Sequence, residues 1–75
     1  MYYILALTYE QAADHAAREN RTEWAFVCDE QTLRGLRQHE QIHTIPGWDR
    51  RPDYLLLRRE ITRRNLEVVV EKAVA

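Results

Sequence analysis

The hydrophobic positions of this chain fall into four short apolar runs, at residues 2–7, 24–28, 42–45 and 66–70. Runs of this length favour buried strands over helices, and the last one, LEVVV, is rich in β-branched residues. The third run is the least apolar, because His43 and Thr44 interrupt it. We therefore expect three to four strands over these segments, with residues 66–70 either forming the fourth strand, which is favoured, or extending the third helix.

The segment after the first run carries the signals of a helix. Thr8 is followed three residues later by Gln11, which is the spacing of a capping box and predicts a helix from about Tyr9. The alanines at 12, 13, 16 and 17 form one narrow face of small side chains that can approach a sheet closely. Asn20 is a plausible end of this helix.

A second, shorter helix is expected after the second run. Asp29 is a favoured N-cap residue, and Leu33 and Leu36 then supply an apolar pair on one face. Gly35 lowers helix propensity, so it either lies near the end of this helix or permits a close contact.

A third helix is expected between the third and fourth runs. Pro52 fits its first turn, and Asp53 would complement the positive end of the helix dipole. Asn65 tolerates the geometry that ends a helix. The residues expected to face the core are Tyr54, Leu57 and Ile61.

The predicted order is β-α-β-α-β-α-β, which implies right-handed crossovers and a parallel sheet with helices on both faces. Such a chain resembles half of a doubly wound, Rossmann-like domain, for which the strand order 2-1-3-4 is suitable. We expect one α/β domain over residues 1–75, with about the last four residues frayed.

Composition and charge narrow the class of protein. The chain has 75 residues, 45% hydrophobic and 31% charged, which is typical of an ordered globular domain. No apolar run is long enough to span a bilayer and no signal peptide opens the chain, so no membrane association and a cytoplasmic location are expected. The single cysteine, Cys28, excludes an internal disulfide and fits a reducing compartment.

The segment TIPGWDRRPDY, residues 44–54, carries the most functional side chains. Ligands of open parallel sheets bind beyond the carboxyl ends of the strands, and this segment follows the third strand. Trp48 has two interpretations: an exposed recognition tip for a partner, which we predict, or a plug over the end of the sheet. The candidate binding residues at this edge are Thr8, Tyr9, Asp29, Gly47, Trp48, Asp49, Arg50 and Arg51.

No catalytic or cofactor motif accompanies these residues. The two glycines form nothing like G-x-G-x-x-G or a P-loop, and the histidines and cysteine lack metal-ligand spacing. Cys28 could pair with His39 or His43 as nucleophile and base, but a small buried hydrophobic role is favoured. Asp29 and Asp49 could act as paired carboxylates, but helix caps are favoured. We expect no enzyme activity, no cofactor and no metal.

The second candidate is a small nucleotide- or nucleic-acid-binding protein that uses the carboxyl edge of the sheet and the arginine-rich third helix, and the charge distribution bears on it. Residues 1–45 carry seven acids and four arginines, whereas residues 46–75 are net basic. Arg58, Arg59 and Arg63 of the third helix could contact phosphates. However, Asp53 and Glu60 are interleaved with them and the net charge is −1, so a solvated charged face is favoured and nucleic acid is not the expected partner.

Three segments, YYILALTYEQAADHAAREN, EWAFVCDEQTLRGLR and IHTIPGWDRRPDY, together resemble the small βαβαβ proteins of unknown function from actinobacteriophages and actinobacteria. The resemblance implies an accessory phage protein that binds a host protein or has a regulatory role in the host cytoplasm. Our expected function is therefore a non-enzymatic protein-interaction module. The β-branched segment from Leu66 to Val70 also predicts homodimerisation through a sheet edge.

Overall fold

The structure is a computed structural model that describes residues 1–71. The predicted fraying of about the last four residues lies outside the described residues. The elements in chain order are β1 (Tyr2–Leu5), α1 (Tyr9–Arg18), β2 (Trp24–Phe26), α2 (Glu30–Arg34), β3 (Gln41–Thr44), the 3-10 helix η1 (Trp48–Arg50), α3 (Tyr54–Arg63) and β4 (Glu67–Val70). This order is the alternation that the apolar runs predict.

The four strands form one parallel sheet in the order β2-β1-β3-β4, which confirms the predicted order. Tyr3 of β1 is in register with Ala25 of β2 and with Ile42 of β3. On the other side of β3, Ile42 is in register with Val68 of β4. The strand β4 therefore forms one edge of the sheet.

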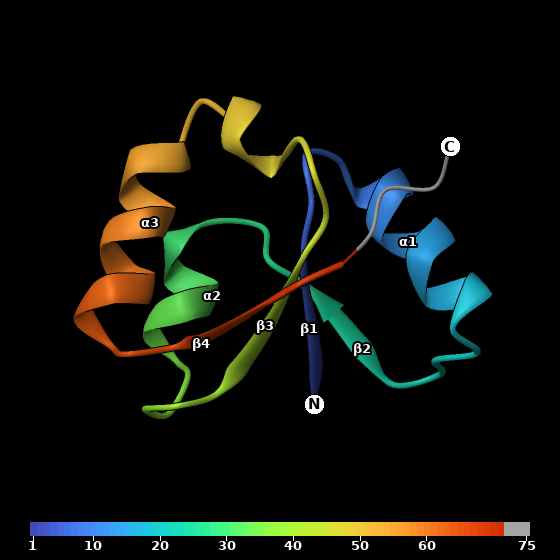
Figure 1. Cartoon of the computed structure of the whole chain (residues 1–75), viewed down its shortest axis with the longest axis horizontal. Helices are drawn as coiled ribbons and strands as arrows, with labels where there is room; N and C mark the ends of the chain where they lie inside the picture. The colour runs from blue at the N-terminus through green and yellow to red at the C-terminus, as the bar shows by residue number, and fades with distance from the viewer. Residues whose placement is uncertain (72–75) are drawn as a thin grey trace.

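Helices cover both faces of the sheet, as Figure 1 shows, with α1 on one side and α2 and α3 on the other. The larger core lies under α2 and α3 and includes Leu5, Val27, Leu33, Leu36, Ile42, Leu57, Ile61 and Leu66. The smaller core lies under α1 and is built from Ile4, Ala6, Ala12 and Ala16. The small side chains of α1 thus allow the close approach to the sheet that the alanine pattern predicts.

The α1 face of the sheet is covered unevenly. Its apolar core involves β1, β2 and Ile45, which follows β3. Within residues 1–71, α1 is the only helix on this side, so the part of the face formed by β3 and β4 has no helix over it. Polar side chains occupy the boundary between the covered and uncovered parts, as described below.

Local signals explain most helix ends. Asn20 and Asn65 both adopt positive φ, 54° and 52°, close to the ends of α1 and α3, and asparagine tolerates this left-handed geometry. Gly35 is the C-cap of α2, which confirms its place at the end of that helix. The prediction for Pro52 is wrong, because α3 begins at Tyr54 and Pro52 lies in the preceding turn.

The described residues contain no helix that is long and apolar enough to cross a bilayer.

Candidate functional site

The predicted binding residues at the carboxyl edge are largely used by the fold. The Thr8 hydroxyl accepts a hydrogen bond from the Gln11 backbone N–H at 3.2 Å, as a helix cap. The Asp29 carboxylate accepts bonds from the backbone N–H groups of Gln31 and Thr32, at 3.0 and 3.3 Å. The cap interpretation is confirmed for Asp29. Asp49 instead lies exposed in the first turn of η1.

Arg51 is buried at this edge of the sheet and binds backbone carbonyls there. Its guanidinium donates to the carbonyls of Ala6, Val27 and Cys28 at 3.2, 2.7 and 2.6 Å. The Asp53 carboxylate accepts two further bonds, at 2.9 and 3.0 Å. Only 9% of Arg51 is exposed. Arg51 therefore binds the ends of the first two strand segments and is unavailable to a ligand in this arrangement.

The partnership with Arg51 also explains why Asp53 is not a helix cap. Asp53 occupies the N-cap position of α3, but its side chain makes no capping hydrogen bond. Both of its carboxylate oxygens face the guanidinium instead, at 2.9 and 3.0 Å. Bidentate arginine–carboxylate pairs of this kind are among the stronger protein hydrogen bonds.

Trp48 is not the exposed tip that we predicted. Its side chain is half-buried, packs against the larger core and contacts Tyr54 with ring centroids 5.0 Å apart. The neighbouring Asp49 and Arg50 are exposed. Gly47 adopts φ 104°, a conformation that side chains disfavour, and so permits the turn into η1. The structure therefore favours the plug interpretation of Trp48.

Two further candidates are surface residues with local contacts. Tyr9 is exposed at the start of α1, and its ring lies near the rings of Trp24 and Phe26, at 5.5 and 5.7 Å. Cys28 is an exposed free thiol, so the interpretation as a small buried hydrophobe is wrong. Cys28 lies two residues beyond the end of β2 and follows Val27, which is fully buried. Among residues 1–71, no group of three or more His, Cys, Asp or Glu side chains is placed to hold a metal ion.

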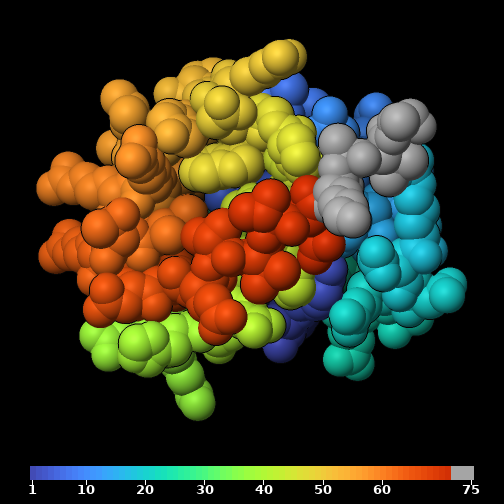
Figure 2. Space-filling view, viewed as in Figure 1, coloured from blue at the N-terminus to red at the C-terminus, as the bar shows by residue number. Residues whose placement is uncertain are grey.

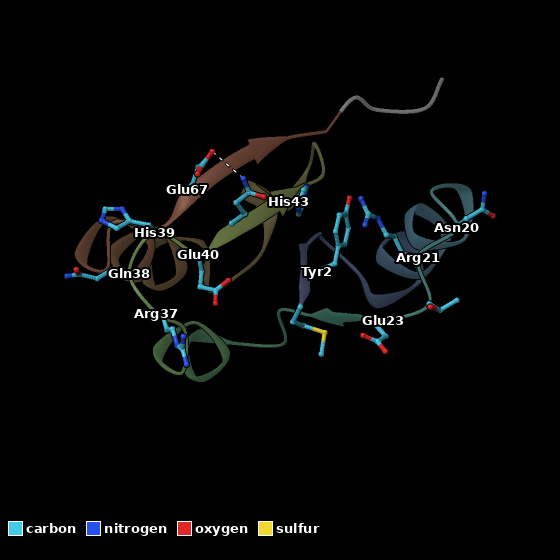
Figure 3. Close-up of a pocket in the computed structure, with 13 residues that line it drawn as sticks. Tyr2, Asn20, Arg21, Glu23, Arg37, Gln38, His39, Glu40, His43 and Glu67 are labelled. Atoms are coloured by element: carbon cyan, nitrogen blue, oxygen red, sulfur yellow. Dashed lines mark hydrogen bonds between the residues drawn. The ribbon is translucent and has the colours of Figure 1, made fainter.

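A hollow lies at the opposite, amino end of the strands. It has a volume of about 760 Å³ and is open to solvent. Figure 3 shows Tyr2 pointing into the space between Arg21 and His43. Charged and polar side chains of both signs line it, among them Arg21, Glu23, Arg37, His39, Glu40 and Glu67. This mixed lining favours no single charge of ligand.

A stack of three side chains forms one wall of this hollow. The rings of Tyr2 and His43 are stacked with centroids 3.9 Å apart, and the Arg21 guanidinium carbon lies 4.3 Å from the Tyr2 centroid. Cation–π attraction and ring stacking both stabilise such an arrangement. The stack lies beside α1, because Tyr2 also packs against the core under that helix.

Glu71 connects this stack to the end of β4. Its carboxylate oxygen lies 2.8 Å from His43 Nδ1 and accepts a hydrogen bond from the Tyr2 hydroxyl at 3.3 Å. The Tyr2 hydroxyl also lies 3.0 Å from Nε2 of His15 in α1. Burial, together with the nearby carboxylate of Glu71, raises the pKa of Tyr2 above its ordinary value. The phenol therefore stays protonated and serves as a hydrogen-bond donor.

This network is internally satisfied. Within the part of the chain that the structure describes, no buried side-chain nitrogen or oxygen lacks a hydrogen-bond partner. The network joins β1, β3 and α1 to the residue after β4, and its members are 13 to 69 positions apart in the sequence. Sequence reasoning missed it because no short motif joins its members. The one available signal was His43, a polar residue inside an otherwise apolar strand.

A third surface lies on the outside of α3. Leu55, Arg58, Arg59, Thr62 and Arg63 line a groove of about 510 Å³ along this helix. Leu56 is also exposed, so six residues form what we call the outer surface of α3. Within residues 1–71, none of the three arginines forms an ion pair; Arg58 donates only to the Tyr54 hydroxyl, at 3.3 Å.

The acids that alternate with these arginines in the sequence are turned away from them. Asp53 binds Arg51. Glu60 is only 4% exposed and pairs with Arg34 of α2 at 3.5 Å and with Arg64 at 3.3 Å. Asp53 and Glu60 are thus interleaved with the arginines in the sequence, but their carboxylates pair elsewhere. Glu60 is buried because α2 packs against its side of α3.

No known family model matches this chain, and no curated protein or solved structure shows significant similarity to it.

Proposed function

We propose that this chain is a non-enzymatic protein-interaction module, and that the outer surface of α3 is its docking surface. The observation that supports this function is that one helix carries two exposed leucines and three arginines that form no ion pair within residues 1–71. Leu55 is 74% exposed and Leu56 is 47% exposed. Arginine is enriched at binding hot spots, and the exposed leucines supply apolar area that a partner can remove from water.

The chemistry of this surface indicates an acidic protein segment with apolar side chains. The guanidinium groups of Arg58, Arg59 and Arg63 would pair with carboxylates, which gives orientation and a faster encounter. Leu55 and Leu56 would be covered by apolar side chains of the partner, and removing their apolar surface from water would supply affinity. An amphipathic helix with glutamates and leucines on one face provides both.

The resemblance stated above fits this function. If the chain is an accessory phage protein, its partner is a protein of the host cytoplasm. A half-Rossmann-like domain is compatible with a binding role. The fold by itself does not specify a reaction, because folds of this kind host many functions. Arg51 adds to this proposal, because it occupies the edge at which an open parallel sheet ordinarily binds small ligands.

Nucleic-acid binding is the second candidate, and one observation favours it. Asp53 and Glu60 pair with Arg51, Arg34 and Arg64, so among the described residues neither carboxylate pairs with the basic face of α3. Three arginines could each contact a phosphate, and affinity would then fall steeply with salt. Phosphates, however, would leave Leu55 and Leu56 uncovered. We expect no sub-micromolar binding of DNA or RNA at physiological salt.

Capture from a host-cell lysate, followed by mass spectrometry, tests the two candidates. The bait is the full chain, and the variant is Arg59→Glu/Arg63→Glu. The control is Arg18→Glu, which changes an exposed arginine of α1 that is paired with Asp14 at 2.7 Å. We expect one protein to be retained by the wild type and the control, resistant to nuclease, and lost with the double variant. Nuclease-sensitive capture would support the second candidate, and equal capture by all three chains would contradict the docking surface.

A further inference from the structure

The strand β4 is an open edge of the sheet. It pairs only with β3 among the described residues, and Figure 2 shows it lying across one face of the molecule. Val68 and Val70 are 42% and 73% exposed. An exposed strand edge that carries β-branched apolar residues favours pairing with another strand.

The hydrogen bonds to β3 show which backbone groups of β4 are free. The Glu67 N–H donates to the Glu40 carbonyl and the Glu71 N–H donates to the Thr44 carbonyl, both at 2.9 Å. Alternate residues of a parallel strand direct both backbone groups to the same neighbour. The N–H and C=O groups of Val68 and Val70 therefore point away from β3, toward an additional strand.

We propose that β4 pairs in antiparallel fashion with β4 of a second copy of this chain, about a twofold axis at Val68. A twofold axis perpendicular to the sheet is the symmetry that joins two identical edges in this way, and it continues both faces of the sheet into the second copy. The product is a continuous sheet in which the two copies of β4 lie at the centre.

The charges of Glu67 and Glu71 favour the register about Val68 over the register about Val69. Pairing about Val69 would place Glu67 of each copy opposite Glu71 of the other, and like charges directly opposite are destabilising. Pairing about Val68 places Val68 opposite its own copy and Glu67 opposite Val69. The register about Val69 pairs Val68 with Val70 of the other copy. The register about Val68 pairs Val68 with its own copy and turns Val70 toward Leu66, whose N–H already donates to the Ile61 carbonyl at 3.0 Å. We assign the register to Val68 because it avoids the two acidic pairs.

The size of the chain also favours a second copy as the occupant. A domain of 75 residues buries a smaller fraction of its surface than a larger one, and association commonly supplies the remaining stability. The edge is self-complementary, since Val68 offers one donor and one acceptor to Val68 of the second copy. A strand from an unrelated protein is the alternative occupant that the experiment below addresses.

Dimerisation would extend the docking surface on α3. This consequence rests on the proposed function, whereas the pairing of the two β4 strands does not. The twofold axis keeps α3 of both copies on the same side of the sheet. The two outer surfaces then face one side, and a partner with two acidic segments could bind both. Such bivalent binding raises the apparent affinity without any new contact.

Sedimentation equilibrium of the full chain tests the pairing. We expect a mass of about twice the 9.0 kDa of the single chain. Val68→Lys places two ammonium groups opposite each other and should raise the dimer dissociation constant about tenfold or more, with an unchanged circular dichroism spectrum. A wild-type mass of 9.0 kDa at millimolar concentration would overturn the proposal, as would a Val68→Lys dimer of wild-type affinity.

A second variant tests the register and changes only an exposed residue. In the proposed register Glu67→Lys faces Val69 and should leave the dimer dissociation constant within about twofold of the wild type. In the register about Val69 the same lysine would face Glu71 and tighten the dimer, which would overturn the assignment to Val68. Arg59→Glu/Arg63→Glu should remain dimeric, so loss of the partner and loss of the dimer are distinguishable.

Discussion

Arg51 joins three segments that lie far apart in the sequence. Its five hydrogen bonds reach the backbone after β1, the backbone after β2 and the Asp53 carboxylate. Replacing it with Met would keep much of its apolar stem but leave three carbonyls and a carboxylate without this donor. We expect Arg51→Met to lower the free energy of unfolding by about 3 kcal/mol, as measured by urea denaturation.

The matched control is Arg50→Met. Arg50 is exposed in η1, and surface substitutions of this kind change stability by less than about 0.5 kcal/mol. An equal effect of both substitutions would show that Arg51 does not hold the carboxyl edge together.

Trp48 makes contacts that predict a stability effect and no specific binding effect. It is half-buried against the larger core and near Tyr54. Because truncation of a partly buried tryptophan opens a cavity, Trp48→Ala should cost about 2 kcal/mol in unfolding free energy. Asp49→Ala, at the exposed neighbour, is the control. A stable Trp48→Ala chain that loses its partner would restore the recognition-tip hypothesis.

Tyr2 should titrate after the ordinary tyrosines. Its pKa is raised by burial and by Glu71, so the protonated phenol is favoured in the folded state. The stabilisation that this shift provides is complete below about pH 10 and is lost as the pH rises through the raised pKa of the folded state. The difference in tyrosinate absorbance between the wild type and Tyr2→Phe reports Tyr2 alone. It should therefore develop at a pH above the range in which ordinary tyrosines titrate. A difference that develops at or below about pH 10 would contradict the network around Glu71.

At the scale of elements, local signals in the sequence predicted most of the fold. Helix ends depend on contacts between residues that are close in the sequence, so spacing alone indicates them. Examples are the caps at Thr8 and Asp29 and the positive φ of Asn65 near the end of α3. The four strands were also predicted from a local feature, the four short apolar runs. The prediction for Pro52 was wrong, because α3 begins only at Tyr54. Asp53 does lie at the start of α3, where its carboxylate binds Arg51 of the preceding turn.

The cap of α2 can be tested directly. This helix has only five residues, and Asp29 satisfies two of its first N–H groups. Asp29→Ala should therefore lower the unfolding free energy by about 1 kcal/mol in denaturant melts. Asp49→Ala removes an acid of the same type that makes no side-chain capping bond, and should have a smaller effect. The reverse order of the two effects would contradict this assignment.

Functional surfaces were predicted less well than elements, and the reason is physical. The carboxyl edge was a sound place to expect a ligand, but sequence spacing could not show that Arg51 would occupy it. Nor could it show that Glu60 would turn toward Arg34 or that Glu71 would reach Tyr2 and His43. Each of these contacts joins residues brought together only by the packed sheet and helices.

At the scale of the whole molecule, the three surfaces have different characters. The carboxyl edge is closed by Arg51, and the hollow at the amino end of the strands has a mixed lining beside the Glu71 network. The outer surface of α3 alone combines exposed apolar side chains with charges of one sign. This combination is why we assign the interaction to α3.

The most direct test of this assignment is an NMR titration of the isotope-labelled full chain with a synthetic amphipathic helix that carries glutamates and leucines on one face. We predict that backbone resonances of residues 55–63 shift, that the affinity falls with salt, and that Arg59→Glu/Arg63→Glu abolishes the shifts while Arg18→Glu keeps them. Shifts confined to Thr8, Asp29 and Asp49 at the carboxyl edge, or to the hollow around Tyr2, would contradict the assignment of the docking surface to α3.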